Sequence, residues 1–199
     1  VSDKAVGEVA AALPLPAGAV VAHTAGSVPL DALPAHARRA VFYPLQTFTK
    51  GRSVDFSQIP LFLETDDESL RPALEAFARR LSHTVVWADS ACRAKVHLAA
   101  VFACNFANHM YAVGERIVRD AGIDFDVLKP LIAETAAKAC DARSPLDVQT
   151  GPAVRNDFAT KARHGDLLSF DLRLKNIYST ISQSLSLIHI SEPTRLGMI

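Results

Sequence analysis

The sequence predicts an α/β portion that extends to about residue 88 and an all-α portion that follows it. Up to that point, short apolar runs alternate with stretches of helical spacing, which is typical of a mainly parallel sheet covered by helices on both faces. From Asp89 onward the spacing is helical throughout, and neither a repeat nor a low-complexity linker intervenes. The 199 residues, 49% of them hydrophobic, suffice for a substantial core.

The α/β portion is predicted to begin with a helix and to continue with four strands. Pro14 ends the first helix, while Ser27 and either Asp66 or Asp67 are suited to cap the two that follow. In chain order, we expect helix 3–13, strand 18–27, helix 28–36, strands 40–43 and 59–64, helix 68–81 and strand 84–87.

The all-α portion opens with a long helix that Gly122 is expected to stop. Its stretch Cys92–Val113 is apolar on most sides, so we expect the fold to bury it. Further helices are predicted over 126–141, 158–165 and 171–183, with a Pro- and Gly-containing loop over 144–157.

Composition excludes several classes of function. The 21 basic and 21 acidic residues are well mixed and give a formal net charge of zero, which offers no electrostatic case for nucleic acid or an anionic membrane. No membrane span or signal peptide is visible. Cys92, Cys104 and Cys140 are odd in number and lack metal-site spacing, so we interpret them as reduced core residues of a cytoplasmic protein.

Both ends of the chain look unusual. The first residues resemble the end of a strand whose body would precede Val1. After Gln183 the sequence changes to S-L-S-L-I-H-I-S-E-P-T-R-L-G-M-I, which resembles translated adaptor or vector sequence. We therefore expect an artefactual tail over 184–199 and leave it out of the functional reasoning.

Polar residues on the long helix are the first candidates for chemistry. At 100° per residue, His97, Val101, Asn105 and Asn108 share an arc of about 80°. His97 could donate a proton while Asn105 or Asn108 orients a substrate, but His97 could equally be a satisfied core histidine. Lys95 is placed on another side of the helix. No carboxylate or second histidine shares the arc, which disfavours a metal site.

Two predicted strand ends carry further candidates, because open α/β sheets bind ligands beyond the carboxyl ends of their strands. His23 and Thr24 lie at one such end, and Gln46 follows Tyr43 at another. A strand cap and a packed turn are the structural alternatives. Gly26 would allow a close approach of a ligand to the backbone.

The loop T-G-P-A-V-R-N-D at 150–157 joins a rigid turn to groups that fix carboxylates or phosphates. Thr150, Arg155 and Asp157 are its candidates, and His164 could face the same point. In the alternative interpretation, Asp157 pairs with Arg155 and caps the next helix.

Four segments together resemble a known family. H-T-A-G-S at 23–27, Y-P-L-Q-T-F at 43–48, K-V-H-L-A-A-V-F-A-C-N at 95–105 and the loop at 150–157 resemble the Rossmann-like proteins with a C-terminal domain of unknown function 2520. These proteins are similar in plan to pyrroline-5-carboxylate reductases and to the 6-phosphogluconate dehydrogenase superfamily. The resemblance covers nearly all of residues 1–183.

The resemblance implies NAD(P) as cofactor and a homodimer formed through the helical domain. It also implies a glycine-rich pyrophosphate turn, which this chain lacks, and it would place Ser2 near the nicotinamide. His97, Asn105, Arg155, Asp157 and His164 match polar positions of the family motifs. Tyr43 departs from the common family form, which has His before Pro-Leu-Gln.

We therefore predict a portion of a Rossmann-like nucleotide-binding domain at 1–88 and a helical substrate and dimerisation domain at 89–183. The preferred function is reduction of a small C=O or C=N substrate with NAD(P), although this chain alone is expected to be inactive. His97 or His164 would act in catalysis, Asn105 would position the substrate, and Arg155 would hold its carboxylate. The alternative is a non-catalytic nucleotide-binding, sensor or dimerisation module.

Overall fold

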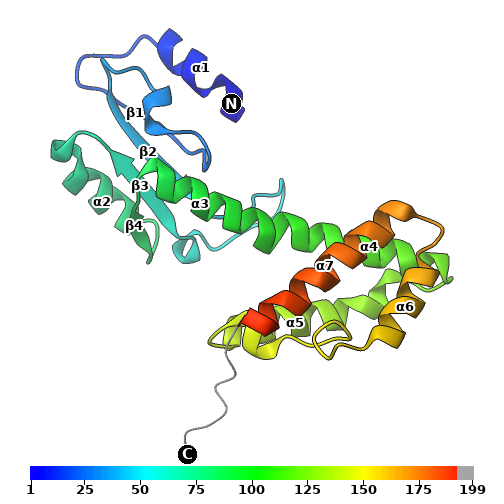
Figure 1. The fold of residues 1–199 in the computed structure, drawn as a ribbon. Coiled ribbons are helices and arrows are strands. Elements are labelled where there is room, and N and C mark those ends of the chain that lie inside the picture. Colours follow the sequence, from blue (N-terminus) through cyan, green and yellow to red (C-terminus); the bar gives the residue numbers. More distant parts are fainter. Residues whose placement is uncertain (192–199) are drawn as a thin grey trace, which may run out of the picture. The chain divides into compact units, whose positions relative to one another are not determined.

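The chain forms two compact units in a computed structural model, Val1–His109 and Met110–Ile199, which are described separately below (Figure 1). The structure describes residues 1–191, and side chains as far as residue 186. The division lies inside a helix, later in the chain than the predicted domain boundary after Ala88, so the first part of the long helix packs with the sheet unit.

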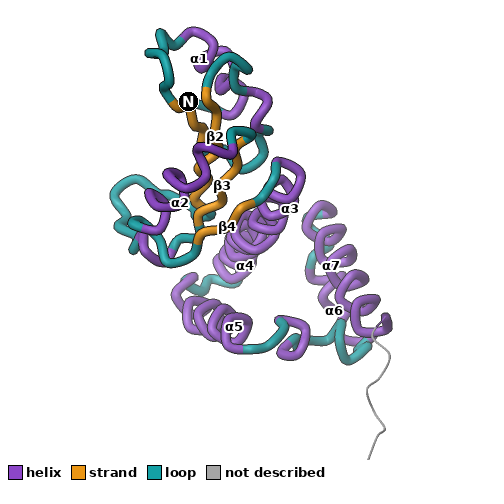
Figure 2. The backbone as a smooth tube through the Cα atoms, turned by 90° about the vertical axis from the view of Figure 1, so that its left-hand side faces the viewer, coloured by secondary structure: helices purple, strands orange, loops and turns teal. Residues whose placement is uncertain are grey.

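A four-stranded sheet forms the centre of the first unit. Its strands, labelled in Figure 1 and coloured orange in Figure 2, lie side by side in chain order: β1 (Val20–His23), β2 (Arg38–Pro44), β3 (Leu61–Thr65) and β4 (Val85–Trp87). The β1–β2 and β3–β4 pairs are parallel, whereas β2 and β3 are antiparallel. The prediction of a mainly parallel sheet with helices, followed by a helical region, is confirmed.

The antiparallel pair follows from the connection between β2 and β3. Residues 45–60 contain only the short 3₁₀ turn Phe56–Gln58, and a parallel pair would need a crossover that carries the chain back along the sheet. As a result, β1 and β2 end at one edge of the sheet while β3 and β4 end at the other.

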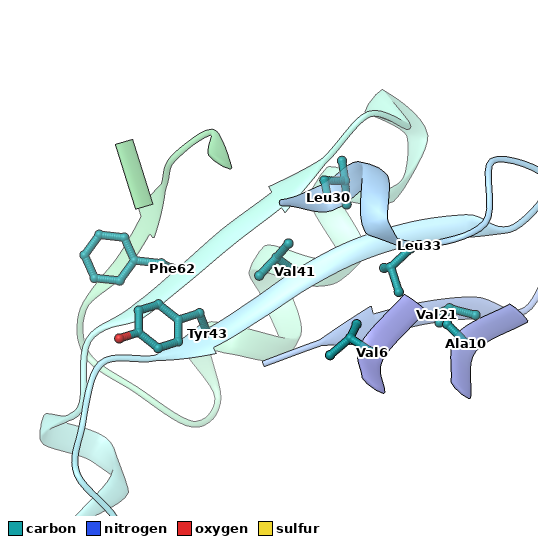
Figure 3. Packing of buried hydrophobic residues seen from close by; sticks show 8 residues of the cluster. All are labelled: Val6, Ala10, Val21, Leu30, Leu33, Val41, Tyr43 and Phe62. Atoms are coloured by element: carbon teal, nitrogen blue, oxygen red, sulfur yellow. The ribbon is translucent and has the colours of Figure 1, made fainter. Parts of the chain in front are cut away.

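Helices cover both faces of this sheet. The helix α1 (Val6–Ala12) packs on the face that carries Val21 and Val41, and α2 (Arg71–Arg79) packs through Ala78 on the opposite face (Figure 1). Asp67 caps the turn before α2, because its carboxylate accepts a hydrogen bond from the Ser69 amide at 3.0 Å. Figure 3 shows the buried cluster under α1, to which α1, the strands and the segment after β1 contribute Val6, Ala10, Val21, Leu30, Leu33, Val41, Tyr43 and Phe62.

The helix expected over 28–36 does not form. Only a 3₁₀ turn, Leu30–Ala32, is present between Pro29 and Pro34, two residues that cannot donate the backbone hydrogen bonds of a helix. Ser27 caps no helix; its hydroxyl donates to Asp3 Oδ2 at 2.9 Å.

The long helix is built from three consecutive segments. They are α3 (Ser90–Ala100), a π-helical segment (Val101–Phe106) and α4 (Ala107–Asp120). Asp89 caps α3 by accepting from the Cys92 amide at 2.7 Å. The expectation that the fold buries this helix is wrong for the single chain: Arg93 is the buried residue of α3, while Leu98 and Phe102 are 57% and 62% exposed. Only one side of α3 packs on the sheet, and no second layer covers the other side within this unit.

Helices make up the second unit. Gly122, with φ 73°, follows α4 as expected. The others are α5 (Lys129–Asp141), α6 (Phe158–Leu167) and α7 (Leu172–Ser191), with short 3₁₀ turns at Phe125–Leu128 and Pro145–Val148. The helix α7 continues past Gln183, where the sequence predicted a change of character; residues 192–199 of the expected tail lie outside the described residues.

Two further expectations concern cysteines and membranes. All three cysteines are free as predicted, but Cys92 and Cys140 are exposed and Cys104 is half-buried, so none is a core residue. The apolar pattern around them suggested burial, but no other described element covers the sides of the helices that carry Cys92 and Cys140. Within residues 1–191, no helix has the length and apolar character needed to cross a membrane.

Candidate functional site

The course of α3 determines which of its residues meet the sheet edge. Because α3 follows β4, which runs opposite to β2, α3 proceeds in the direction of β2. Arg93 meets Glu64, which pairs with Val41 in the middle of β2. One turn later, His97 meets Tyr43 near the end of β2. Polar residues of α3 therefore reach the edge where β1 and β2 end, which is where open α/β sheets bind ligands.

His97 and Tyr43 form the best-defined polar pair at this edge. The Tyr43 hydroxyl oxygen lies 3.2 Å from His97 Nδ1, and the two rings meet edge-on. Tyr43 is buried, and burial raises the pKa of its hydroxyl above the ordinary value. Figure 3 shows its ring beside Phe62, with the hydroxyl directed away from the apolar cluster. A core residue thus presents one polar atom to the helix.

Gly26 lies directly against this pair. A Cβ atom added there would be 2.5 Å from His97 Nδ1 and 2.8 Å from Tyr43 Cζ. The absence of a side chain at Gly26 therefore allows the two rings to pack on the backbone. This packing accounts for the glycine at position 26, and its role in cofactor binding stays a prediction.

A pocket of about 490 Å³ opens beside His97. Tyr43, Gln46 and Thr47 line it from the end of β2, and His97 and Asn105 line it from α3 and the π-helical segment. Its remaining lining is apolar apart from the thiol of Cys104 and comprises Leu45, Val96, Ala99, Ala100, Val101 and Ala103. The structure thus brings together one imidazole, two amides and two hydroxyls around an apolar wall.

Asn108 and Lys95 do not line this pocket. The angular prediction assumed a regular α-helix, whereas the π-helical segment Val101–Phe106 places more residues in each turn. Residues after the segment are therefore rotated from their expected positions. Asn105 stays at the pocket, and Asn108 is exposed elsewhere on α4.

The residues at the end of β1 are arranged differently from one another. His23 is only 6% exposed; its Nδ1 accepts a hydrogen bond from the Ala25 amide at 3.2 Å, which supports its interpretation as a strand cap. Burial, followed by the positive charge of Arg93, lowers the pKa of His23 below the ordinary value. Thr24 is exposed, and Ser2 is exposed just before the first 3₁₀ turn.

A buried ion pair one helical turn before His97 was not predicted as part of the site. Arg93, 1% exposed, forms an ion pair with Glu64 and donates a second hydrogen bond to the Val28 carbonyl. Ser90 Oγ lies 2.8 Å from Glu64 Oε1 and accepts from the Leu30 amide at 3.0 Å. The sequence signal was an arginine and a glutamate in otherwise apolar patterns, two types that are seldom fully buried unless paired.

In the second unit, one candidate of the loop at 150–157 has a structural role, whereas the others do not. Asp157 caps α6, since Oδ1 accepts from the Thr160 amide at 3.0 Å; this bond and the nearby cations lower the pKa of the carboxyl. The Arg155 guanidinium is exposed and bonds to no other described residue. Thr150 borders a separate, largely apolar pocket of about 280 Å³. The alternative interpretation is thus correct for the cap, whereas its Arg155–Asp157 pair does not form among the described residues.

His164 also pairs with a tyrosine. Its Nδ1 lies 2.8 Å from the Tyr178 hydroxyl, which joins α6 to α7. This contact gives His164 a structural partner within the helical unit, and sequence spacing alone did not identify it.

Neither a metal nor a whole dinucleotide finds a complete set of groups among the described residues. No cluster of three or more His, Cys, Asp or Glu side chains suited to a metal occurs within residues 1–186, whose side chains the structure describes. The sequence contains no G-x-G-x-x-G turn, whose backbone would hold a pyrophosphate. Thr24 and Gln46, at the ends of β1 and β2, are exposed.

Comparisons with known proteins agree with this architecture. The family profile described as "Domain of unknown function (DUF2520)" matches residues 59–185. A provisionally assigned NADP oxidoreductase from Bacteroides fragilis is 39% identical, with a TM-score of 0.87 over 94% of this chain and 73% of its own. A Thermotoga maritima protein of known structure is 25% identical, with a TM-score of 0.79 over 96% of this chain and 76% of its own.

A third solved structure, a pyrroline-5-carboxylate reductase from Coxiella burnetii, is 13% identical over 92% of this chain and 72% of its own. Its TM-score of 0.41 is too low to support an argument. No curated protein matches the chain.

Proposed function

Because this chain belongs to the family of the domain of unknown function 2520, we propose that it is part of an oxidoreductase that reduces a small C=O or C=N substrate with NAD(P)H. The similarity to a provisionally assigned NADP oxidoreductase supports the oxidoreductase class. The observation that carries the proposal is the His97–Tyr43 pair on a pocket at the edge where β1 and β2 end.

In this proposal the cofactor, when bound, supplies a hydride to the substrate carbon. His97 donates the matching proton to the oxygen or nitrogen: the imidazolium loses its Nε2 proton and becomes neutral. Asn105 offers an amide on the same pocket for positioning the substrate. The apolar wall reduces the access of water to the reacting atoms.

The surroundings of the other candidate residues decide how well each one suits its proposed role. Arg155 is exposed and bonds to no other described residue, which suits its proposed role in holding a substrate carboxylate, with Thr150 and Asn108 as further substrate contacts. Asp157 and His164 already have structural partners, so His164 is the weaker candidate for catalysis.

The candidates for cofactor binding differ in exposure. Thr24, Gln46 and Ser2 are exposed and suit this role. His23 and Gly26 are buried and suit it less.

A glycine-rich turn upstream of Val1, an artefactual C-terminal tail, a domain boundary after Ala88 and a cytoplasmic location complete the proposal. The genomic reading frame on both sides of the chain tests the first two. Since the chain as given has no such turn, we expect it to be inactive by itself.

Activity is tested with the chain extended by its upstream genomic sequence. We expect NADPH oxidation with at least one member of a panel of keto and imino acids, and about a 100-fold or larger loss of kcat in His97→Gln. His36→Gln, a change at an exposed histidine away from the pocket, is the matched control. Binding of NADPH without turnover on any substrate would refute the reductase.

The alternative function is a non-catalytic nucleotide-binding or dimerisation module. Exposed apolar side chains on the long helix favour the dimerisation part: Leu98, Phe102 and Phe106 are 57%, 62% and 49% exposed. A contiguous apolar surface of this kind usually marks an interface. We propose a homodimer in both cases, and only turnover separates the two functions.

A further inference from the structure

We propose that Tyr43 is a positioning residue that keeps a proton on Nε2, the pocket-facing nitrogen of His97, in both protonation states of the imidazole. The catalytic use of that proton rests on the proposed function, whereas the arrangement itself does not. Tyr43 is a core residue of β2 and is 54 positions away from His97 in the sequence.

The first step concerns the hydrogen of the Tyr43 hydroxyl. The side chain is 8% exposed, and its hydroxyl has no hydrogen-bond partner other than His97 Nδ1 among the described residues. A buried donor without an acceptor costs about 1–3 kcal/mol. If neutral His97 carried its proton on Nδ1, the Tyr43 hydrogen would lose its one acceptor among the described residues. The neutral ring is therefore stabilised with Nδ1 as acceptor and the proton on Nε2.

The second step concerns where Nε2 points. His97 lines the pocket, and Nε2 has no hydrogen-bond partner among the side chains described up to residue 186. It is also not one of the enclosed, unpartnered polar atoms, which are His23 Nε2 and Arg93 Nε. With Nδ1 held by Tyr43, Nε2 is the nitrogen left to address a ligand.

The third step is the fixed orientation of both rings. The backbone of Gly26 packs directly against both rings, since even a methyl group there would lie within 2.9 Å of both. Phe62 packs on Tyr43 with a centroid distance of 6.2 Å. Rotation of either ring would therefore disturb packed neighbours, and the hydrogen bond is held by the core.

The arrangement of His97 and Tyr43 makes Nε2 a hydrogen-bond donor. The imidazolium carries hydrogens on both nitrogens, and the neutral ring held by Tyr43 still carries one on Nε2. A substrate oxygen or nitrogen in the pocket consequently meets a hydrogen-bond donor in either state. Such an arrangement favours protonation of the substrate over removal of a proton from it.

The tautomer can be measured without any turnover. We would label the histidines of the 199-residue chain with ¹⁵N and record long-range ¹H–¹⁵N spectra at pH 8, where an ordinary histidine is neutral. His97→Gln identifies the His97 signals among the seven histidines. We expect wild-type Nδ1 to be unprotonated and Nε2 protonated; a protonated Nδ1 would overturn the proposal before any tyrosine is changed.

Tyr43→Phe is the decisive variant, because it removes the hydroxyl and keeps the ring. We expect the His97 nitrogen signals to move toward the average of two exchanging tautomers. Tyr178→Phe is the matched control, since it removes the equivalent hydroxyl from His164 and should leave His97 unchanged. Unchanged His97 signals in Tyr43→Phe would refute the role of Tyr43. If Tyr43 fixes the His97 tautomer but the extended protein shows no turnover, only the proposed reductase is refuted.

Discussion

Gly26 lies where no side chain fits, and this makes it a sensitive probe of the site. In Gly26→Ala the new methyl group would lie 2.5 Å from His97 Nδ1, so His97, Tyr43 or the backbone has to shift. We expect a loss of about 1–3 kcal/mol in the free energy of unfolding, measured by urea denaturation.

Gly165→Ala is the control of opposite sign. Gly165 lies inside α6, where an added Cβ would meet only the flexible end of Lys175 at 3.6 Å. Removing a helical glycine there should stabilise the protein by about 0.5–1 kcal/mol. Equal effects of the two substitutions would contradict the packing role of Gly26.

His23 predicts how stability depends on pH. Burial lowers its folded-state pKa, so below the ordinary pKa of about 6.5 the unfolded chain binds a proton that the folded chain does not. The free energy of unfolding is therefore highest above the ordinary pKa. It decreases as the pH falls from that value toward the lower folded-state pKa of His23. Unfolding curves between pH 7.5 and 5 measure it.

His23→Asn keeps an acceptor for the Ala25 amide but cannot titrate in this range. We expect its stability to decline less than that of the wild type as the pH falls. His36→Asn, at an exposed histidine, should follow the wild-type curve. A parallel decline in wild type and His23→Asn would exclude His23 as the source.

At the scale of elements, the Arg93–Glu64 pair joins α3, β3 and the segment after β1. Glu64→Gln would leave a guanidinium that is 1% exposed without its counter-charge. Breaking one partner of a buried ion pair costs about 3–5 kcal/mol. We expect a loss of this size in the free energy of unfolding, accompanied by displacement of the start of α3.

Glu68→Gln provides the comparison within the same unit. It breaks the exposed pair of Glu68 and Arg71, whose side chains are 81% and 41% exposed, and such a pair contributes about 1 kcal/mol at most. If both substitutions cost the same, the Arg93–Glu64 pair would not hold these elements together.

The elements also show what sequence patterns can predict. The strands, the Asp67 cap and the stop at Gly122 depend on local residue preferences, and the structure confirms them. The antiparallel β2–β3 pair, the π-helical segment and the Tyr43–His97 contact depend on tertiary packing between distant segments. Candidate residues could therefore be named from the sequence, while their partners could not.

At the scale of the whole molecule, exposed apolar residues predict self-association. Phe102 is 62% exposed, and its ring packs on that of Phe106 with centroids 4.9 Å apart. If this pair lies in a dimer interface, Phe102→Asp buries a charge there and should convert dimers to monomers at equal concentration. Sedimentation velocity measures the change.

Phe48→Asp is the matched control, because Phe48 is similarly exposed, at 56%, but belongs to the segment between β2 and β3. It should leave the sedimentation coefficient unchanged. A wild-type chain that sediments as a monomer at all concentrations would refute the homodimer.

The course of α3 along the pocket also sets a length scale for ligands. His97 and Asn105 are eight positions apart and line the same pocket from different turns of the long helix. A substrate that contacts both side chains therefore extends along the helix axis. A screen for substrates should therefore be ordered by molecular length before it is ordered by functional group.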